Sequence, residues 1–120
     1  MVAVVGTAAM SVASQAPASA DADFGCDYPK VCLYFNSEDW AFRKPTATYQ
    51  NIISNWRKLG SGGRHAYAVF NSRNNDVVQL LHTDGTEDCV APKGTWFHNQ
   101  GGASKVVVGV KILDDPICFD

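Results

Sequence analysis

The sequence predicts an all-β fold in which two stacked halves of short strands enclose one core, and three features of the chain indicate it. The first is a set of short runs rich in β-branched and aromatic residues and bounded by Gly, Asn, Asp or Pro: Val31–Phe35, Ala66–Phe70, Val77–His82 and Lys105–Leu113. The second is Asp84-Gly85, a pair that favours a tight hairpin turn after the third run. The third is an apolar run followed by Phe-Asn-Ser, which occurs twice and suggests a duplicated unit.

The N-terminal residues predict an export signal. Residues 1–20 are apolar or small, carry no charge, and end in Ala-Ser-Ala at 18–20, the small-x-small pattern that precedes signal-peptidase cleavage. A membrane anchor is the alternative, and Gly6 and Pro17 argue against it because they interrupt a run already short for a span. We therefore expect a signal peptide, a mature single domain of residues 21–120, and a secreted protein with no stable membrane association.

Four cysteines lie in the expected mature part: Cys26, Cys32, Cys89 and Cys118. In an exported chain of this size an even number of cysteines predicts disulfides, with three possible connectivities. Cys26 and Cys32 flank a turn-prone segment that can bring them together, which leaves Cys89 with Cys118. No Cys-x-x-Cys occurs and the histidines lack ligand spacing with cysteine, so zinc and thioredoxin-type chemistry are not favoured.

The middle of the chain predicts a short helical turn and a junction between two halves. Within Thr48–Leu59, four apolar residues are spaced for one face of a helix: Ile52, Ile53, Trp56 and Leu59. The Gly-rich run at 60–63 that follows is typical of a flexible join. The two halves would then be residues 21–59 and 64–120, each a Greek key of four short strands, and their stacking would bury one shared core.

Several motifs together resemble one family. They are the expected signal, the Cys26 to Cys32 clip, Val31-Cys32-Leu33-Tyr34, the aromatic hairpin Phe35-x4-Trp40, and Ile53-Ser54-Asn55-Trp56. These features resemble the βγ-crystallin-type Greek key, and in particular the secreted actinobacterial metalloproteinase-inhibitor family built on it. The resemblance covers most of the mature chain, and it implies a disulfide-stabilised two-Greek-key sandwich that acts as a peptidase inhibitor.

The segment Asp88-Cys89-Val90-Ala91-Pro92 is the predicted inhibitory loop. The resemblance implies that Cys89-Val90 occupies the active-site cleft of an extracellular zinc metalloprotease. A substrate-like inhibitor presents a segment held in its bound shape. Cys89 would tether one side and Pro92 would stiffen the other, while Val90 is the bulky apolar side chain that a thermolysin-like enzyme accepts after the cut. The alternative is that Cys89 only staples the C-terminus and the segment is an ordinary turn.

Crystallin-type motifs also bind calcium through the pattern Asn/Asp-Asn/Asp-x-x-Ser/Thr-Ser, which supplies oxygen ligands to a hard cation. Residues 50–55 keep the second and fifth positions as Asn51 and Ser54, and residues 99–104 keep only the end positions. A structural loop is the alternative at both places. A calcium-stabilised structural module is therefore one alternative function, and a killer-toxin-like or cell-surface and glycan-binding module on the same fold is another.

Enzymatic chemistry is not expected. The chain contains neither Gly-x-Ser-x-Gly nor His-Glu-x-x-His, and the adjacent Glu38 and Asp39 would point to opposite faces of a strand at a solvated hairpin tip. We expect His65, His82 and His98 at the surface or at strand edges. The formal charge of -2, without a basic run, argues against nucleic acid as a partner. We therefore expect a monomer without a cofactor, whose partner is an extracellular protease.

Overall fold

The computed structural model describes residues 22–98 and 106–118, so the expected signal peptide lies outside the described residues. Within these ranges the single helix is α2 (Ser37–Ala41). The strands are β1 (Ala22–Asp23), β2 (Cys26–Asp27), β3 (Val31–Tyr34), β4 (Ala47–Tyr49), β5 (Arg57–Lys58), β6 (Ala68–Asn71), β7 (Val77–His82), β8 (Glu87–Val90), β9 (Thr95–Phe97) and β10 (Val107–Leu113).

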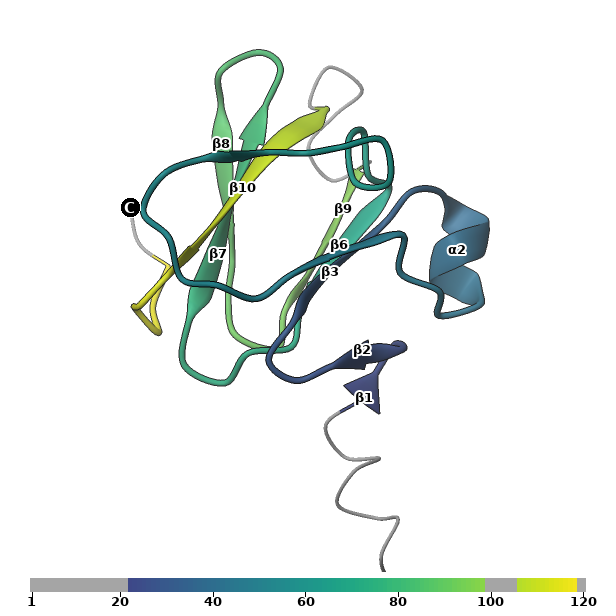
Figure 1. The fold of residues 1–120 in the computed structure, drawn as a ribbon, viewed down its shortest axis with the longest axis horizontal. Helices are drawn as coiled ribbons and strands as arrows, with labels where there is room; N and C mark the ends of the chain where they lie inside the picture. The colour runs from purple at the N-terminus through teal and green to yellow at the C-terminus, as the bar shows by residue number, and fades with distance from the viewer. Residues whose placement is uncertain (1–21, 99–105, 119–120) are drawn as a thin grey trace, which may run out of the picture.

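The described residues form two antiparallel four-stranded sheets and a small β1–β2 ribbon, which confirms the all-β prediction. One sheet has the order β4-β3-β6-β9 and the other has the order β5-β10-β7-β8. Figure 1 shows the two sheets as separate layers, with α2 at one end of the first sheet and the ribbon below it. The four runs predicted as strands correspond to β3, β6, β7 and β10, with ends that shift by a few residues.

The order of strands contains an internal correspondence between β3 to β6 and β7 to β10. In each set the first strand lies between the second and the fourth, and the third strand crosses to the other sheet. The division therefore falls between Asn71 and Val77. The predicted boundary between 21–59 and 64–120 lies instead inside the first set, because the Gly-rich run at 60–63 joins β5 to β6.

The Phe-Asn-Ser repeat that suggested duplication does not mark equivalent positions. Strands β3 and β6 are antiparallel neighbours, with Val31 opposite Asn71, so the two copies lie at opposite ends of one sheet. Asn36 of the first copy caps α2, whereas Asn71 of the second copy is fully buried. The Phe-Asn-Ser match therefore does not mark the structural correspondence between the strands β3 to β6 and the strands β7 to β10.

Both faces of the sheet β4-β3-β6-β9 are covered. In β3, Val31 and Leu33 belong to the core between the sheets, whereas Cys32 and Tyr34 belong to a second cluster on the outer side. Side chains from the ribbon, α2 and β9 complete that second cluster: Phe24, Trp40 and Phe97. Because alternate residues of a strand face opposite sides, a sheet covered on both sides needs continuous apolar runs such as Val-Cys-Leu-Tyr.

The predicted hairpin between β7 and β8 is confirmed. The His82 and Thr86 backbones pair across the turn, and Gly85 has a positive φ of 85°. That conformation is unfavourable for residues with a Cβ atom and easy for glycine. Asp84 Oδ1 accepts hydrogen bonds from the Thr86 amide at 3.0 Å and from the Thr86 hydroxyl at 2.6 Å, which fixes the turn further.

The helix prediction was wrong, and so was the predicted hairpin at Phe35 to Trp40. Residues 48–59 form the end of β4, an irregular loop and β5, and Ile52 and Ile53 are exposed, so no apolar helix face is buried there. The helix lies instead at α2. Asn36 Oδ1 caps it by accepting from the Asp39 amide at 2.8 Å, and Glu38 and Asp39 in its first turn favour the helix N-terminus.

Candidate binding surfaces

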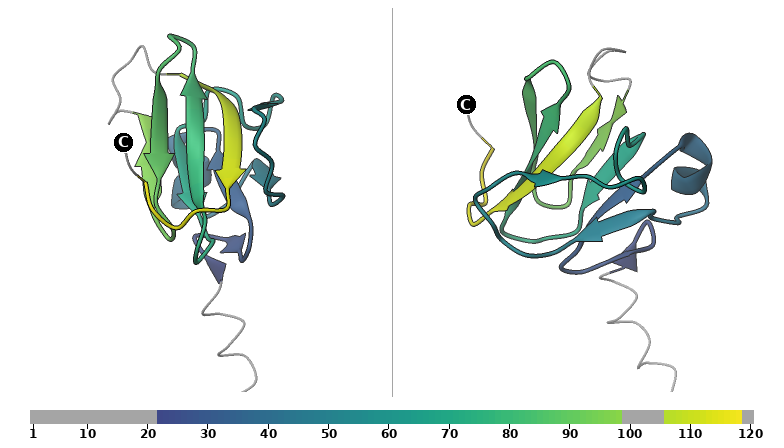
Figure 2. Two further views of the ribbon diagram at one scale, coloured as in Figure 1. Left: turned by 90° about the vertical axis from the view of Figure 1, so that its left-hand side faces the viewer. Right: turned by 45° about the horizontal axis from the view of Figure 1, so that its top comes forward.

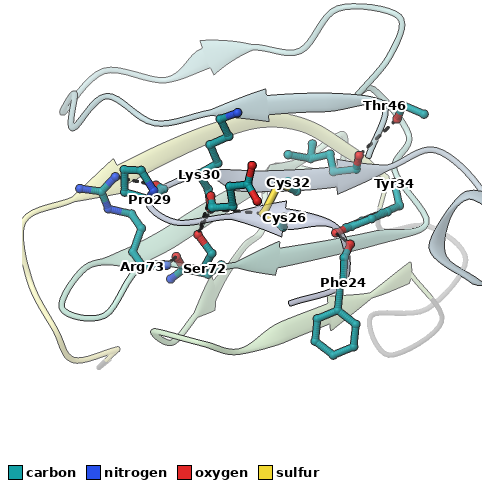
Figure 3. Close-up of a disulfide and its surroundings, with 12 residues drawn as sticks. Phe24, Cys26, Pro29, Lys30, Cys32, Tyr34, Thr46, Ser72 and Arg73 are labelled. Atoms are coloured by element: carbon teal, nitrogen blue, oxygen red, sulfur yellow. Dashed lines mark hydrogen bonds between the residues drawn. A yellow bond between two sulfur atoms is a disulfide. The ribbon is translucent and has the colours of Figure 1, made fainter. Parts of the chain in front are cut away.

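The described residues contain both predicted disulfides, Cys26–Cys32 and Cys89–Cys118, and no free cysteine. Two disulfides are compatible with an extracellular protein. Figure 3 shows the Cys26–Cys32 bond beside the side chains that hold the turn between β2 and β3. Cys26 and Cys32 are both fully buried, so the predicted structural role of Cys32 fits its position.

Arg73 and Ser72 clamp the loops around the first disulfide (Figure 3). The Arg73 guanidinium donates to the carbonyls of Pro29 at 2.8 Å and of Gln50 at 2.9 Å, and its Nε atom contacts Asp76 at 2.7 Å. The Ser72 hydroxyl donates to the Lys30 carbonyl at 2.6 Å. These bonds tie the segments before β3 and after β4 to the loop after β6, so we assign them a structural role.

The segment predicted as an inhibitory loop is mostly part of the sheet. Asp88, Cys89 and Val90 lie in β8, paired with Leu80, Gln79 and Val78 of β7, and β8 is an edge strand. The Val90 side chain is 3% exposed and belongs to the core. It therefore cannot enter a protease cleft while the sheet is intact, and the prediction that Val90 is presented to an enzyme was wrong.

Asp88 and His82 form a polar network behind β8. Asp88 Oδ2 lies 2.8 Å from His82 Nε2 and accepts from Trp96 Nε1 at 3.2 Å. His82 is 1% exposed and its ring lies against that of Trp96, which corrects the expected surface or strand-edge position of this histidine. This network gives His82 Nε2 a partner at an inward position of β7, whereas Nδ1 is buried without a hydrogen-bond partner among the described residues.

Ala91 and Pro92, the rest of the predicted loop, begin a turn that we call the 91–94 turn. The Gly94 amide donates to the Ala91 carbonyl at 2.8 Å, and Lys93 has a positive φ of 63°. Ala91 and Lys93 are exposed, and Pro92 is half-buried. A Cβ atom at Gly94 would lie 2.9 Å from the Ala91 carbonyl oxygen, so the turn requires glycine there.

Asn71 holds the 91–94 turn against the fold. Its backbone exchanges hydrogen bonds with the turn, because the Lys93 amide donates to the Asn71 carbonyl at 2.8 Å and the Asn71 amide donates to the Gly94 carbonyl at 3.0 Å. Its side-chain amide donates to the carbonyls of Val90 and Ala91, both at 3.2 Å. The turn is therefore exposed on its outer side and fixed from below.

The calcium candidates Asn51 and Ser54 lie in the irregular loop between β4 and β5, and both are exposed. The second partial match, residues 99–104, lies outside the described residues. Among the residues that the structure describes, no group of three or more His, Cys, Asp or Glu side chains is placed to hold a metal ion. Over the same ranges no helix has the length and apolar character required to cross a bilayer.

A groove of about 660 Å³ lies over β5, β7 and β10. Its lining combines apolar side chains with a basic rim: Trp56, Arg57, Lys58, Leu59, Arg64, Leu81, His82, Thr83, Gly85, Val108 and Gly109. We call this the basic groove. Sequence reasoning missed it because Arg57, Arg64 and Gly109 come together only through the strand order.

A smaller hollow of about 380 Å³ lies beside α2 and brings two of the three histidines together, His65 and His98. Its other lining residues are Phe35, Asn36, Ser37, Tyr67 and Val106. His82 lines the basic groove instead. Two histidines with an aromatic and a hydroxyl side chain could contact a polar ligand, but two of the lining residues, His98 and Val106, flank residues 99–105 in the sequence, and the structure does not describe those residues.

The chain matches no family model, and it matches neither a curated protein nor a solved structure.

Proposed function

We propose that this chain is an exported, non-enzymatic peptidase inhibitor built on a βγ-crystallin-like pair of Greek keys, and that it blocks an extracellular zinc metalloprotease with the 91–94 turn. The strand order supports the fold part of the proposal. In each set of four strands the fourth returns to lie beside the first, as in a Greek key, and the third strand is exchanged between the sheets.

The rigidity of the 91–94 turn is the observation that carries the functional part. A binding segment that is already fixed loses little conformational freedom on association, which favours affinity. Here Asn71 fixes the turn from below, Val90 anchors its start in the core, and the Cys89–Cys118 disulfide ties the preceding strand to the C-terminal segment. A nick in the turn would leave both ends held in place.

The position of β8 adds a second contact surface to the proposal. In the described sheet β8 has a neighbouring strand on one side only, and extended segments of other proteins bind edge strands by strand addition. Strand β8 leads directly into the 91–94 turn, so a protease that pairs with β8 would meet Ala91 and Lys93 next. Val90 acts in this mechanism as an anchor of the turn, and the contact with the enzyme shifts to Ala91–Gly94.

The test is a titration of a thermolysin-like metalloprotease with the oxidised protein, with a serine protease as a control. We expect stoichiometric inhibition of the metalloprotease. Ala91→Glu should weaken inhibition by roughly tenfold, because it places a charge in the contact and would bury it unpaired. Ala41→Glu, the same change at an exposed alanine of α2, should have no effect. A folded wild-type protein that inhibits neither enzyme would disprove the proposal.

A further inference from the structure

We propose that the basic groove binds an acidic peptide segment of a partner protein that carries apolar side chains between its carboxylates. The first argument is the difference between the two sheets. The outer face of β4-β3-β6-β9 is covered by the aromatic cluster, whereas the sheet β5-β10-β7-β8 carries the groove on its outer face. Figure 2 shows β7, β8 and β10 side by side, with that face turned to the viewer in the left view.

The register of the strands identifies which residues share this outer face. Leu80 and Val110 pair with each other and belong to the core, so the adjacent pair, Leu81 and Gly109, faces outward. Lys58 lies opposite Gly109 on the other side. Because glycine has no side chain, the surface is hollowed between Lys58 and Leu81, and this hollow forms part of the groove floor.

The charge of the groove is the second argument. Three cations gather on or beside it, and in the described part of the chain none of them forms a salt bridge: Lys58, Arg64 and Lys111. Arg57 also lines the groove, but it pairs with the core residue Val110 and its guanidinium lies 5.9 Å from the centre of the Tyr49 ring, so we do not count it among them. The net charge of the whole chain is -2, so this positive patch is local and opposes the overall charge. It follows β5 and β10, whereas the exposed Glu87 of β8 lies opposite Leu81 on the other side of the floor. A concentrated positive patch attracts anionic ligands and speeds their association.

The apolar floor decides between kinds of anion. Trp56 and Leu81 line the groove, and Lys111 Nζ lies 4.2 Å from the centre of the Trp56 ring. A polymer that carries only charge would leave the floor without partners. A peptide in which acidic and apolar residues alternate would place its carboxylates at the rim and its apolar side chains on the floor.

The groove and the 91–94 turn lie at opposite ends of β8. Thr83 and Gly85, which line the groove, belong to the hairpin before β8, and the turn follows β8. One protein could therefore hold a protease with the turn and an acidic segment with the groove. The groove proposal does not depend on the inhibitor proposal, because each names its own residues and its own ligand.

The experiment measures fluorescence anisotropy of a labelled peptide of alternating Glu and Leu, titrated with the oxidised wild-type protein. Two comparison peptides replace Glu by Gln or Leu by Ser. Lys58→Gln should weaken binding roughly two- to fivefold, the range expected for one exposed charge pair. Lys44→Gln, at an exposed lysine away from the groove, should leave binding unchanged. The Lys58→Gln/Arg64→Gln/Lys111→Gln variant should lose roughly tenfold or more, with circular dichroism confirming that it is folded.

Each other outcome counts against the proposal. Equal effects of Lys58→Gln and Lys44→Gln would show attraction to charge in general. Equal binding of the Leu and Ser peptides would remove the role of the apolar floor. Binding of a sulfated polysaccharide without binding of the Glu-Leu peptide would assign the groove to a different class of macromolecule.

Discussion

Val90 was predicted to contact a protease, and in the structure it is a core residue that anchors the 91–94 turn. It lies beside exposed residues in the chain, yet its side chain packs in the core between the sheets. Val90→Ala should lower the free energy of unfolding by about 2 kcal/mol, because it removes two buried methyl groups and leaves a small cavity. Urea denaturation measures this loss. The folded variant should still inhibit the protease. A variant that loses inhibition but keeps the stability of the wild type would show that Val90 contacts the protease.

Tyr34 links the stability of the fold to alkaline pH. Burial raises the pKa of its hydroxyl above the ordinary value of 10.0, and the hydroxyl donates to the Phe24 carbonyl at 2.6 Å. Its stabilising effect is therefore complete below pH 10 and is lost above it, because the unfolded chain then releases a proton that the folded chain keeps. The free energy of unfolding should fall by about 1.4 kcal/mol per pH unit there.

The matched comparison for this effect is between two tyrosines. Tyr34→Phe should remove this part of the slope above pH 10 and lower stability below it by about 1 kcal/mol, the usual net contribution of a hydrogen bond. Tyr28 is 46% exposed, and Tyr28→Phe should keep the slope of the wild type. Urea denaturation series across this pH range measure all three proteins. An unchanged slope in Tyr34→Phe would contradict the assignment.

At the scale of elements, the chain predicted strands better than anything else. The runs that became β3, β6, β7 and β10 are continuous and apolar because all four lie in the middle of a sheet, where each strand pairs with a neighbour on both sides. The hairpin at Asp84-Gly85 was predictable because a positive φ selects glycine. The short strands β4, β5 and β9 escaped prediction, since two or three residues cannot show a period.

The helix was misplaced for a related reason. Spacing alone favoured residues 48–59, but spacing does not say whether a face will be buried, and Ile52 and Ile53 stay exposed. The cap at Asn36 was a local signal within the aromatic stretch that was assigned to a hairpin. The candidate sites also differ in whether neighbouring residues in the sequence reveal them. The disulfides and the 88–92 segment could be found along the chain, whereas the basic groove joins residues 56–64 to 81–85 and 108–109.

At the scale of the whole molecule, the two sheets differ in what covers their outer faces. The first carries aromatic residues on its outer face, where the ribbon and α2 pack on them, and the Cys26–Cys32 disulfide closes that side. The second leaves its outer face for the basic groove and its edge strand for the 91–94 turn. A small domain buries limited apolar area, so disulfides contribute a large share of its stability.

Removal of the two disulfides should have different effects on the free energy of unfolding and on protease inhibition. Cys89–Cys118 spans 29 residues and Cys26–Cys32 spans 6. Since a longer closed loop removes more freedom from the unfolded chain, Cys89→Ala/Cys118→Ala should cost about 3.5 kcal/mol of unfolding free energy, measured by urea denaturation. It should also weaken protease inhibition, because the strand before the turn loses its covalent anchor, and should leave peptide binding at the groove intact, because β7 and β10 stay paired.

Cys26→Ala/Cys32→Ala is the matched control for this prediction. Its loop entropy alone is about 2.2 kcal/mol, and the loss of two buried sulfur atoms adds to it. Inhibition by the folded control protein should stay at the wild-type level, because the first disulfide lies on the other sheet. A stability loss below about 1 kcal/mol in Cys89→Ala/Cys118→Ala would contradict the loop-closure argument. Equal inhibition by both double variants would instead assign the rigidity of the turn to Asn71 and the core alone.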